Sequence, residues 1–426
     1  MADKKKRILT GIRPTGPLHL GHYAGALENW VRLQDDYDCF FLIADYQALS
    51  DHIDEIDRIR EAVIQVTLDW LAVGLDPERS AFVIQSYVPE FAELSMLLSM
   101  ITPLARLQRN PTLKAEMDRI DAGELSVGFY TYPVSQVADI LLPKADLVPV
   151  GDDQLPHVEL TREIARKFNR AYGEVFPEPE ELVGRVPRLV GTDGQAKMSK
   201  SLDNCIYLGD SEETVNQRVA AMYTDPTRIH PTDPGHVEGN PVFMYHDTFN
   251  PDKAEVEELK ERYRAGRVGD VEVKQRLARA LNAFMEPVRQ RRRFYEQRMD
   301  EVKEALLAGT RRAKQVAEAT MADVRSAMRI DRYTEGLFAI GAPPKAAMSQ
   351  EDGLAELARR KLEPFWDPDH QDGPVRFRPA RGAKGRPAEE TDRTWQRKLI
   401  EALELMSEAN VAAVRKEVRR RVARRT

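Results

Sequence analysis

The 426-residue chain has little cysteine and no long apolar run. Its two cysteines, Cys39 and Cys205, are too few for a disulfide framework or for a cysteine-only metal cluster. No stretch approaches the length of a membrane-spanning helix, and no apolar segment follows the basic start at residues 4–7 as it would in a secretory signal. These absences predict a cytoplasmic protein with no membrane association.

Acidic and basic residues are unevenly distributed along the chain. The net charge of −6 argues against indiscriminate binding of nucleic acid. Residues 376–426, however, hold 15 Lys/Arg and seven Asp/Glu, a net +8, so the preceding residues carry −14. We therefore expect a local nucleic-acid surface near the C-terminus, with a well-charged terminal helix as the alternative interpretation.

Apolar, β-rich segments alternate with helical patterns in the first half of the chain, which is typical of an α/β fold with a parallel sheet. The expected strands are residues 8–11, 40–44, 82–85 and 147–150. A helix is expected at residues 56–73, with Gly74 as its stop signal. In such sheets ligands bind beyond the carboxyl ends of the strands.

From about residue 207 onward the pattern is helical, without clear strands. Helices are expected at residues 213–222, at 271–306 with a kink or break at Pro287, and at 313–328. Beyond residue 330 the chain has a short amphipathic stretch at 354–362, a loop-like run at 376–387 and a final helix at about 392–425.

The first motif with chemical meaning is His19-Leu20-Gly21-His22, which follows the first expected strand and a turn-rich stretch. Two imidazoles at i and i+3 on a first helical turn both face a ligand at that helix end, where backbone N–H groups favour anions. Gly21 lets a nucleotide base approach the backbone closely. Each histidine is able to donate a hydrogen bond to a phosphate oxygen.

The second motif is Lys197-Met198-Ser199-Lys200-Ser201, which the chain reaches through a glycine-bounded stretch, residues 191–194. Two ammonium groups on a mobile loop suit a leaving pyrophosphate, whose charge grows in the transition state. Either motif alone is common in unrelated loops. Together and in this order they indicate a site for the triphosphate of ATP.

With both motifs in place, residues 6–330 resemble class I aminoacyl-tRNA synthetases, and the tryptophanyl branch in particular. The supporting stretches are residues 10–16 (TGIRPTG), 131–133 (TYP), 138–142 (ADILL) and 148–154 (VPVGDDQ), the last with Asp152 in place of the family's Glu. The resemblance implies a Rossmann-like catalytic domain at 1–206 with a dimerisation segment at about 90–145, and an α-helical anticodon-binding domain at 207–333. Residues 334–426 form a basic C-terminal extension and a candidate tRNA-binding arm. The resemblance also implies a homodimer.

The reaction that the resemblance implies joins L-tryptophan to ATP, releases pyrophosphate, and passes tryptophan from its adenylate to tRNA(Trp), with Mg²⁺ shielding the phosphates. No protein ligand for a metal is expected. The implied catalytic residues are His19, His22, Lys197 and Lys200. The implied ATP contacts are Gly11, Arg13, His19, Gly21, His22, Lys114, Gly151, Asp153, Lys197, Met198, Ser199, Lys200 and Ser201.

The implied tryptophan contacts are Leu9, Gly11, Tyr132, Gln136, Asp139, Val148, Val150 and Gln154. Tyr132, Gln136 and Asp139 are spaced i, i+4 and i+7, so they share one face if the segment is helical past Pro133. The family's matching Asp accepts the indole N–H of tryptophan. Gln together with Asp at this spacing also occurs in tyrosyl enzymes, so tyrosine is the nearest alternative substrate.

Two interpretations from other classes stay open. Metabolite nucleotidyltransferases share the first motif and its sheet, although they are usually shorter and lack the lysine loop. A non-catalytic, synthetase-like RNA-binding protein is the other.

The expected helical region contains a cationic cluster that suits tRNA phosphates, Arg289, Arg291, Arg292 and Arg293. The alternative interpretation of this cluster is a solvated helix face.

Overall fold

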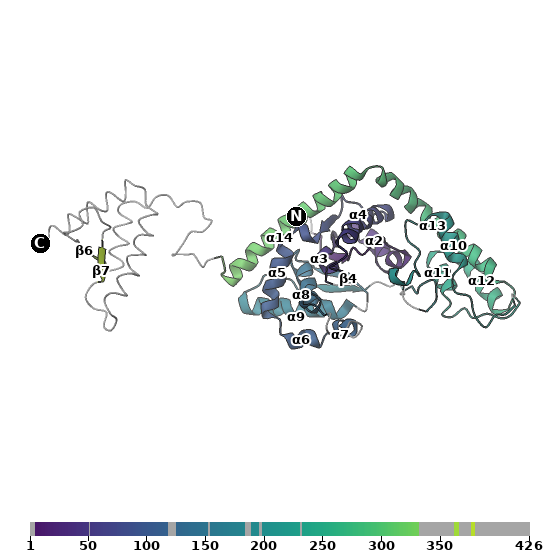
Figure 1. Ribbon diagram of the computed structural model, residues 1–426, viewed down its shortest axis with the longest axis horizontal. Coiled ribbons are helices and arrows are strands. Elements are labelled where there is room, and N and C mark those ends of the chain that lie inside the picture. The colour runs from purple at the N-terminus through teal and green to yellow at the C-terminus, as the bar shows by residue number, and fades with distance from the viewer. Residues whose placement is uncertain are drawn as a thin grey trace. The chain divides into compact units, whose positions relative to one another are not determined.

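A computed structural model describes residues 5–50, 52–117, 125–151, 154–183, 189–195, 198–230 and 232–331, and the backbone of 362–365 and 376–379. Residues 1–330 form one compact unit and residues 331–426 another (Figure 1). The stretch expected at 354–362, apart from Leu362, and the helix expected at 392–425 lie outside the described residues. The loop expected from residue 376 is wrong at its start, because β7 (Arg376–Pro379) pairs there with β6 (Leu362–Phe365) as antiparallel strands.

The first unit contains a five-stranded sheet in the order β3-β2-β1-β4-β5, in which each neighbouring pair of strands is parallel. The α/β prediction is therefore confirmed. Its strands are β1 (Arg7–Ile12), β2 (Asp38–Ile43), β3 (Ala81–Ile84), β4 (Leu147–Val150) and β5 (Glu180–Val183). Strand β5 is not among the strands expected above, because its four residues begin with two glutamates and lack the apolar run of a buried strand.

Helices cover the sheet and extend beyond it. Those up to β5 are α1 (Leu20–His22), the π-helix η1 (Tyr23–Leu27), α2 (Glu28–Asp36), α3 (Asp45–Ala48), α4 (Ile56–Val73), the 3₁₀ turn η2 (Gln85–Tyr87), α5 (Glu90–Ile101), α6 (Leu104–Gln108), α7 (Pro111–Met117), α8 (Val127–Leu141) and α9 (Leu155–Tyr172). After it come the 3₁₀ turn η4 (Lys200–Leu202), α10 (Glu212–Ala220), α11 (Pro241–Phe249), α12 (Lys253–Arg264), α13 (Asp270–Glu296) and α14 (Met299–Met328). No helix among the described residues is both long and apolar enough to span a membrane.

Two hydrophobic cores lie on opposite faces of the sheet, because successive strand side chains point to opposite sides. On β2, Phe41 and Ile43 belong to one core while Phe40 and Leu42 belong to the other. The first core continues into α10–α13, which gather at one end of the unit, whereas α5–α9 lie at the other end (Figure 1). The sheet and the later helices thus share buried contacts.

The ends of two helices show where glycine and proline in the sequence predict helix boundaries correctly and where they do not. Helix α4 ends at Val73, as expected, because Gly74 takes the left-handed conformation with φ of 104°. The expected break at Pro287 is wrong, since this proline lies inside α13 and the chain breaks instead at Gln297 and Arg298. The buried neighbours Met285 and Val288 pack into the core on both sides of Pro287, so tertiary packing outweighs the missing hydrogen bond.

Candidate active site

A cavity of about 680 Å³ opens at the carboxyl ends of β1 and β4. Strand β1 lies between β2 and β4, so the order of the strands reverses beside it, and α/β sheets bind ligands at such a point. Eleven of the residues implied by the resemblance line this cavity: Leu9, Gly11, Arg13, His22, Tyr132, Gln136, Asp139, Val148, Val150, Gly151 and Gln154.

The first motif forms the turn that begins α1. His19 is the N-cap and is buried, with 6% of its surface exposed. Its backbone N–H donates to His22 Nδ1 at 3.2 Å, and the two rings lie 3.8 Å apart between centroids. Because Nδ1 of His22 accepts a hydrogen bond, the neutral ring carries its hydrogen on Nε2. The expected strand, turn and helix start are all present.

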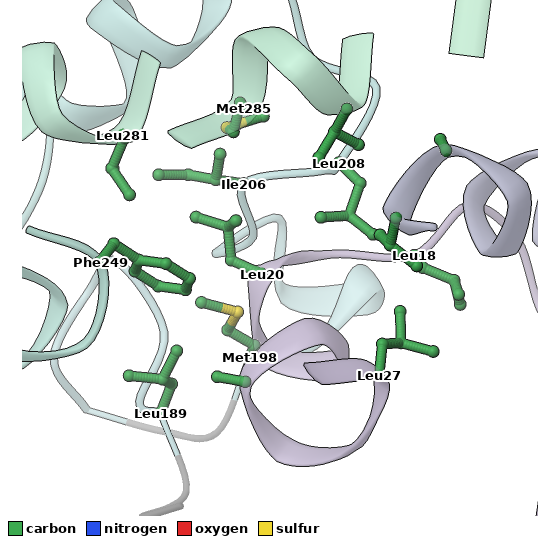
Figure 2. Close-up of a cluster of buried hydrophobic side chains, with 14 of the residues drawn as sticks. Leu18, Leu20, Leu27, Leu189, Met198, Ile206, Leu208, Phe249, Leu281 and Met285 are labelled. Atoms are coloured by element: carbon green, nitrogen blue, oxygen red, sulfur yellow. The ribbon is translucent and has the colours of Figure 1, made fainter. Parts of the chain in front are cut away.

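The second motif packs directly against the first. Met198 is buried, and its Sδ accepts a hydrogen bond from the Gly21 N–H at 3.2 Å. Figure 2 shows Leu20, Met198 and Ile206 together in the core beneath the first motif. In this conformation the space beside Gly21 is therefore filled by a methionine side chain of this chain. Lys197 lies outside the described residues, as do Asp152 and Asp153.

Lys200 Nζ donates to Gly16 O at 2.8 Å and to Thr15 Oγ1 at 3.4 Å, so its ammonium group rests on the loop before the first motif. Burial, followed by the nearby charge of Arg58, lowers the pKa of Lys200 to about 8. This lysine therefore retains most of its charge at neutral pH but titrates in the mildly alkaline range.

Asn204 joins the two ends of the loop that carries the second motif. Its Nδ2 donates to Asp193 Oδ2 at 3.1 Å, its Oδ1 accepts from the Ser199 N–H at 2.7 Å, and its carbonyl accepts from the Thr192 N–H at 3.0 Å. A Cβ at Gly191 would lie 2.1 Å from Asn204 Nδ2, so the contact also requires that glycine. The sequence analysis missed Asn204, which gives no signal in the sequence apart from its place after the motif.

Asp139, which also lines the cavity, is a buried carboxylate held by two glutamine amides. Gln85 Nε2 donates to Oδ1 at 2.6 Å, and Gln47 Nε2 donates to Oδ2. Burial raises the pKa of Asp139 to about 7, although both amide hydrogen bonds act in the opposite direction. Each carboxylate oxygen has a further lone pair, so the group is able to accept another N–H.

Gln47 and Gln85 were also missed by the sequence analysis. A signal existed, because both follow the carboxyl ends of neighbouring parallel strands, β2 and β3, and such positions gather at one edge of a sheet.

Helix α8 passes through Pro133 without breaking, and Tyr132, Gln136 and Asp139 all line the cavity, as the spacing predicts. The hydroxyl of Tyr132 donates to Glu116 Oε2 at 2.7 Å. The buried His157 ring lies 5.7 Å from the Tyr132 ring. Glu116 and His157 therefore join the predicted residues in the lining of the cavity.

Some predicted residues lie elsewhere. Lys114 is exposed on α7 and does not line the cavity, in contrast to Glu116 on the same helix. Residues 198–201 are outside the cavity lining as well, with Ser199 held by Asn204 and Ser201 in the turn η4. Among the described residues no group of three or more His, Cys, Asp or Glu side chains forms a metal site.

Only half of the cationic cluster on α13 is exposed to solvent, namely Arg291 and Arg293. The Arg289 side chain is 7% exposed and bonds Glu286 and Asn282, while Arg292 is 12% exposed and pairs with Asp69. Arg291 Nε donates to Ala72 O. The interpretation as tRNA contacts is wrong for Arg289 and Arg292, because burial against α13's neighbours removes their guanidinium groups from solvent.

Comparison with known proteins supports the same family. The sequence profile of the family described as tRNA synthetases class I (W and Y) matches residues 1–286. A tryptophan–tRNA ligase of Chlamydia caviae is 52% identical over 314 residues, which cover 72% of this chain and 91% of that protein. Among solved structures, tryptophanyl-tRNA synthetase from Campylobacter jejuni, complexed with ADP and tryptophan, has 35% identity and a TM-score of 0.68, covering 76% of this chain and 99% of that one.

A tyrosyl-tRNA synthetase from Archaeoglobus fulgidus, complexed with L-tyrosine, is less similar, with 27% identity and a TM-score of 0.53 over 68% of this chain and 91% of that one. The parallel α/β fold, with the first motif at the cavity and the second motif packed against the first, matches the fold of the class I synthetases. The chain belongs to the family of class I tRNA synthetases for tryptophan and tyrosine.

Proposed function

We propose that the chain is a tryptophan–tRNA ligase. The carboxylate of L-tryptophan attacks the α-phosphate of ATP, pyrophosphate leaves, and the adenylate then transfers its acyl group to the terminal ribose of tRNA(Trp). No covalent bond to the protein is needed, so catalysis consists of positioning the reactants and stabilising the developing charge.

The observation that carries this proposal is the combination of groups that line the cavity. His22 of the first motif lines it, and Lys200 rests on the Thr15–Gly16 turn just before that motif, an arrangement that suits phosphates. The same cavity is lined by the buried carboxylate of Asp139 and by apolar side chains such as Val148 and Leu9. An amino acid with a large apolar ring and one N–H donor fits this combination, and tryptophan is the amino acid whose ring offers such a donor.

His22 and His19 hold phosphate oxygens, and Lys200 follows the leaving pyrophosphate together with Lys197. Because Lys200 rests on the Thr15–Gly16 turn, its loop must move for this contact to form. ATP therefore replaces contacts within the protein by contacts to phosphate. Gln154 and Gly151 contact the reactants from the end of β4. Mg²⁺ bound together with ATP would offset negative charge on the phosphates, and no residue of this chain is assigned as its ligand.

Exchange of pyrophosphate into ATP, driven by each of the twenty amino acids in turn, tests the proposal. Tryptophan is expected to support exchange far better than tyrosine. Faster exchange with tyrosine would assign Gln136 and Asp139 to a phenol, and no exchange with any amino acid would favour a nucleotidyltransferase or a non-catalytic RNA-binding protein.

We assign the dimerisation segment to residues 90–145, since exposed apolar side chains concentrate there. Met96, Met100, Leu104 and Val127 are 53%, 74%, 60% and 80% exposed. Large exposed apolar groups in one region are typical of a protein interface. We expect M100E to shift the protein from dimer to monomer in analytical ultracentrifugation, with V271E as the control, since Val271 is 71% exposed and lies outside this segment.

The remaining assignments follow the family resemblance. Residues 1–206 act as the catalytic domain and residues 207–333 as the anticodon-binding domain, in a cytoplasmic enzyme. Residues 334–426 act as a basic arm for tRNA, supported by their excess of arginine and lysine.

A further inference from the structure

A buried carboxylate outside the cavity lies directly behind the first motif. Asp69 on α4 has none of its surface exposed, and its Oδ2 accepts the backbone N–H of Leu18 at 2.8 Å. Leu18 is the residue before His19. The carboxylate therefore fixes the backbone of the turn that carries His19.

The partner of Asp69 comes from the late helices. Arg292 on α13 donates through Nη1 to Asp69 Oδ1 and through Nη2 to Gln65 on α4, while its Nε donates to Glu296 at 2.9 Å. A Cβ added to Gly209 would lie 3.3 Å from Arg292 Nε, so the chain passes closely over the guanidinium group. Arg292 is thus held by partners on two helices and by a backbone contact.

Backbone pairing fixes the same turn from its other side. The Leu208 N–H donates to Leu18 O and the Leu20 N–H donates to Ile206 O, both at 2.9 Å. Residues 206–208 follow the loop of the second motif. The Leu18–Leu20 segment is therefore held from two sides. Residues 206–208, which follow the second motif, bond its backbone on one side, and Asp69, which is paired with Arg292 of α13, bonds it on the other.

The buried ion pair of Asp69 and Arg292 is not explained by its contribution to folding stability. Removing an ion pair's charges from water costs several kcal/mol, and apolar replacements of buried pairs are often neutral or stabilising. Burial raises the pKa of Asp69 to about 6, although Arg292 and the Leu18 N–H oppose this shift. The carboxylate is therefore kept ionised by the two groups that it orients.

We propose that Asp69 and Arg292 are positioning residues for amino acid activation: through the Leu18 N–H, they hold the His19 turn at the place where α-phosphate chemistry occurs, in a position set by α13. Neither side chain touches a reactant. The inference rests on the proposed activation of tryptophan, because it concerns the geometry of that step.

The test measures tryptophan-dependent pyrophosphate exchange for D69N, R292Q and the double variant. D69N keeps an oxygen for the Leu18 N–H but loses the charge that orients Arg292. We expect each single variant to lower kcat about tenfold while KM for tryptophan changes less than about twofold, and the double variant to lose much less than the product of the two. R276Q is the matched control, since Arg276 lies on the same helix and pairs with Glu255 and Glu272. It should retain wild-type kcat.

Wild-type kcat in folded D69N and R292Q, or a double variant whose loss equals the product of the single losses, would overturn the inference. R292K keeps the charge and so avoids an unpaired buried carboxylate, which guards against a variant that fails to fold. It should lower kcat by about threefold and speed hydrogen exchange at the Leu18 amide. Unchanged kcat and exchange in R292K would also overturn the inference. Failure of the wild-type protein to exchange with tryptophan would instead refute the proposed function.

Discussion

Asp139 has to be charged in an environment that disfavours charge. Its pKa of about 7 means that the folded protein binds this proton more tightly than the unfolded chain does. Between the ordinary value of 3.8 and about 7, its contribution to the free energy of unfolding therefore falls as the pH rises. Gln47 and Gln85 limit this cost by donating to both oxygens.

Replacing Asp139 with Ala should lower kcat/KM for tryptophan by between about 10² and 10⁵, because a site built around a hydrogen bond rejects a partner that no longer completes it. Pyrophosphate exchange measures the loss, and circular dichroism checks the fold. In the wild-type enzyme KM for tryptophan should rise as the pH falls below 7, since protonation removes an acceptor, whereas D139N should lack this dependence. A pH-independent KM in the wild-type enzyme would contradict the assigned role.

The ionisation of Lys200 limits activity at alkaline pH. Its pKa of about 8 predicts that kcat/KM for ATP declines as the pH rises above 8, because the lysine loses its charge there. K200A should lower kcat by about tenfold or more, corresponding to about 1.4 kcal/mol. K200R should remove the alkaline decline. Unchanged kcat with only a raised KM for ATP would rule out a contact specific to the transition state.

At the scale of single residues, spacing predicted the shared face of Tyr132, Gln136 and Asp139, because helical period is a local property. The same reasoning failed for Arg292. An arginine-rich stretch is ordinarily exposed, and its burial against Asp69 depends on a helix more than 200 residues earlier, α4. Long-range charge pairing leaves no local signal in the sequence.

Among the elements, the loop that carries the second motif, residues 191–204, is held at both ends by hydrogen bonds of the described residues. Gly194 has a φ of 74° and packs against Tyr223, whose N–H donates to Thr192 O at 2.8 Å. Asn204 closes the loop from the other end. Fixed ends limit the positions that Lys200 is able to reach when its contacts to Thr15 and Gly16 are replaced.

Removing the Asn204 side chain should therefore slow activation without affecting tryptophan binding. We expect N204A to lower kcat for exchange by about tenfold and to speed limited proteolysis within residues 191–204. N216A is the control, because Asn216 lies on α10, outside the loop, where its Oδ1 accepts from Asn282 Nδ2 at 2.9 Å. Equal kcat and equal cleavage rates in N204A and the wild-type protein would show that the loop does not depend on this contact.

The elements that sequence reasoning located well are those whose signals are local. Strand β4 and helix α4 match their expected bounds, because an apolar run and a stop glycine define them. The boundary between α13 and α14 was misplaced, since packing around Pro287 preserves one helix and the true break carries neither glycine nor proline.

For the whole molecule, the two units differ in the sign of their net charge. Residues 331–426 hold 20 Lys/Arg and 16 Asp/Glu, a net +4 that is concentrated in residues 376–426, so residues 1–330 carry −10. A compact catalytic unit with negative net charge gains little from non-specific attraction to RNA, so a basic extension would supply it.

Deleting the residues after Ala342 should leave tryptophan-dependent pyrophosphate exchange unchanged, because the cavity and both motifs lie within residues 1–330. The same truncation should weaken tRNA binding and reduce the slope of log affinity against log salt concentration, since fewer phosphate counterions are released. Filter binding over a salt series measures both quantities. A full-length variant with Arg419, Arg420 and Arg421 changed to Gln separates charge from length and should reproduce part of the loss. If the truncated enzyme binds tRNA with unchanged affinity and slope, the extension serves another purpose.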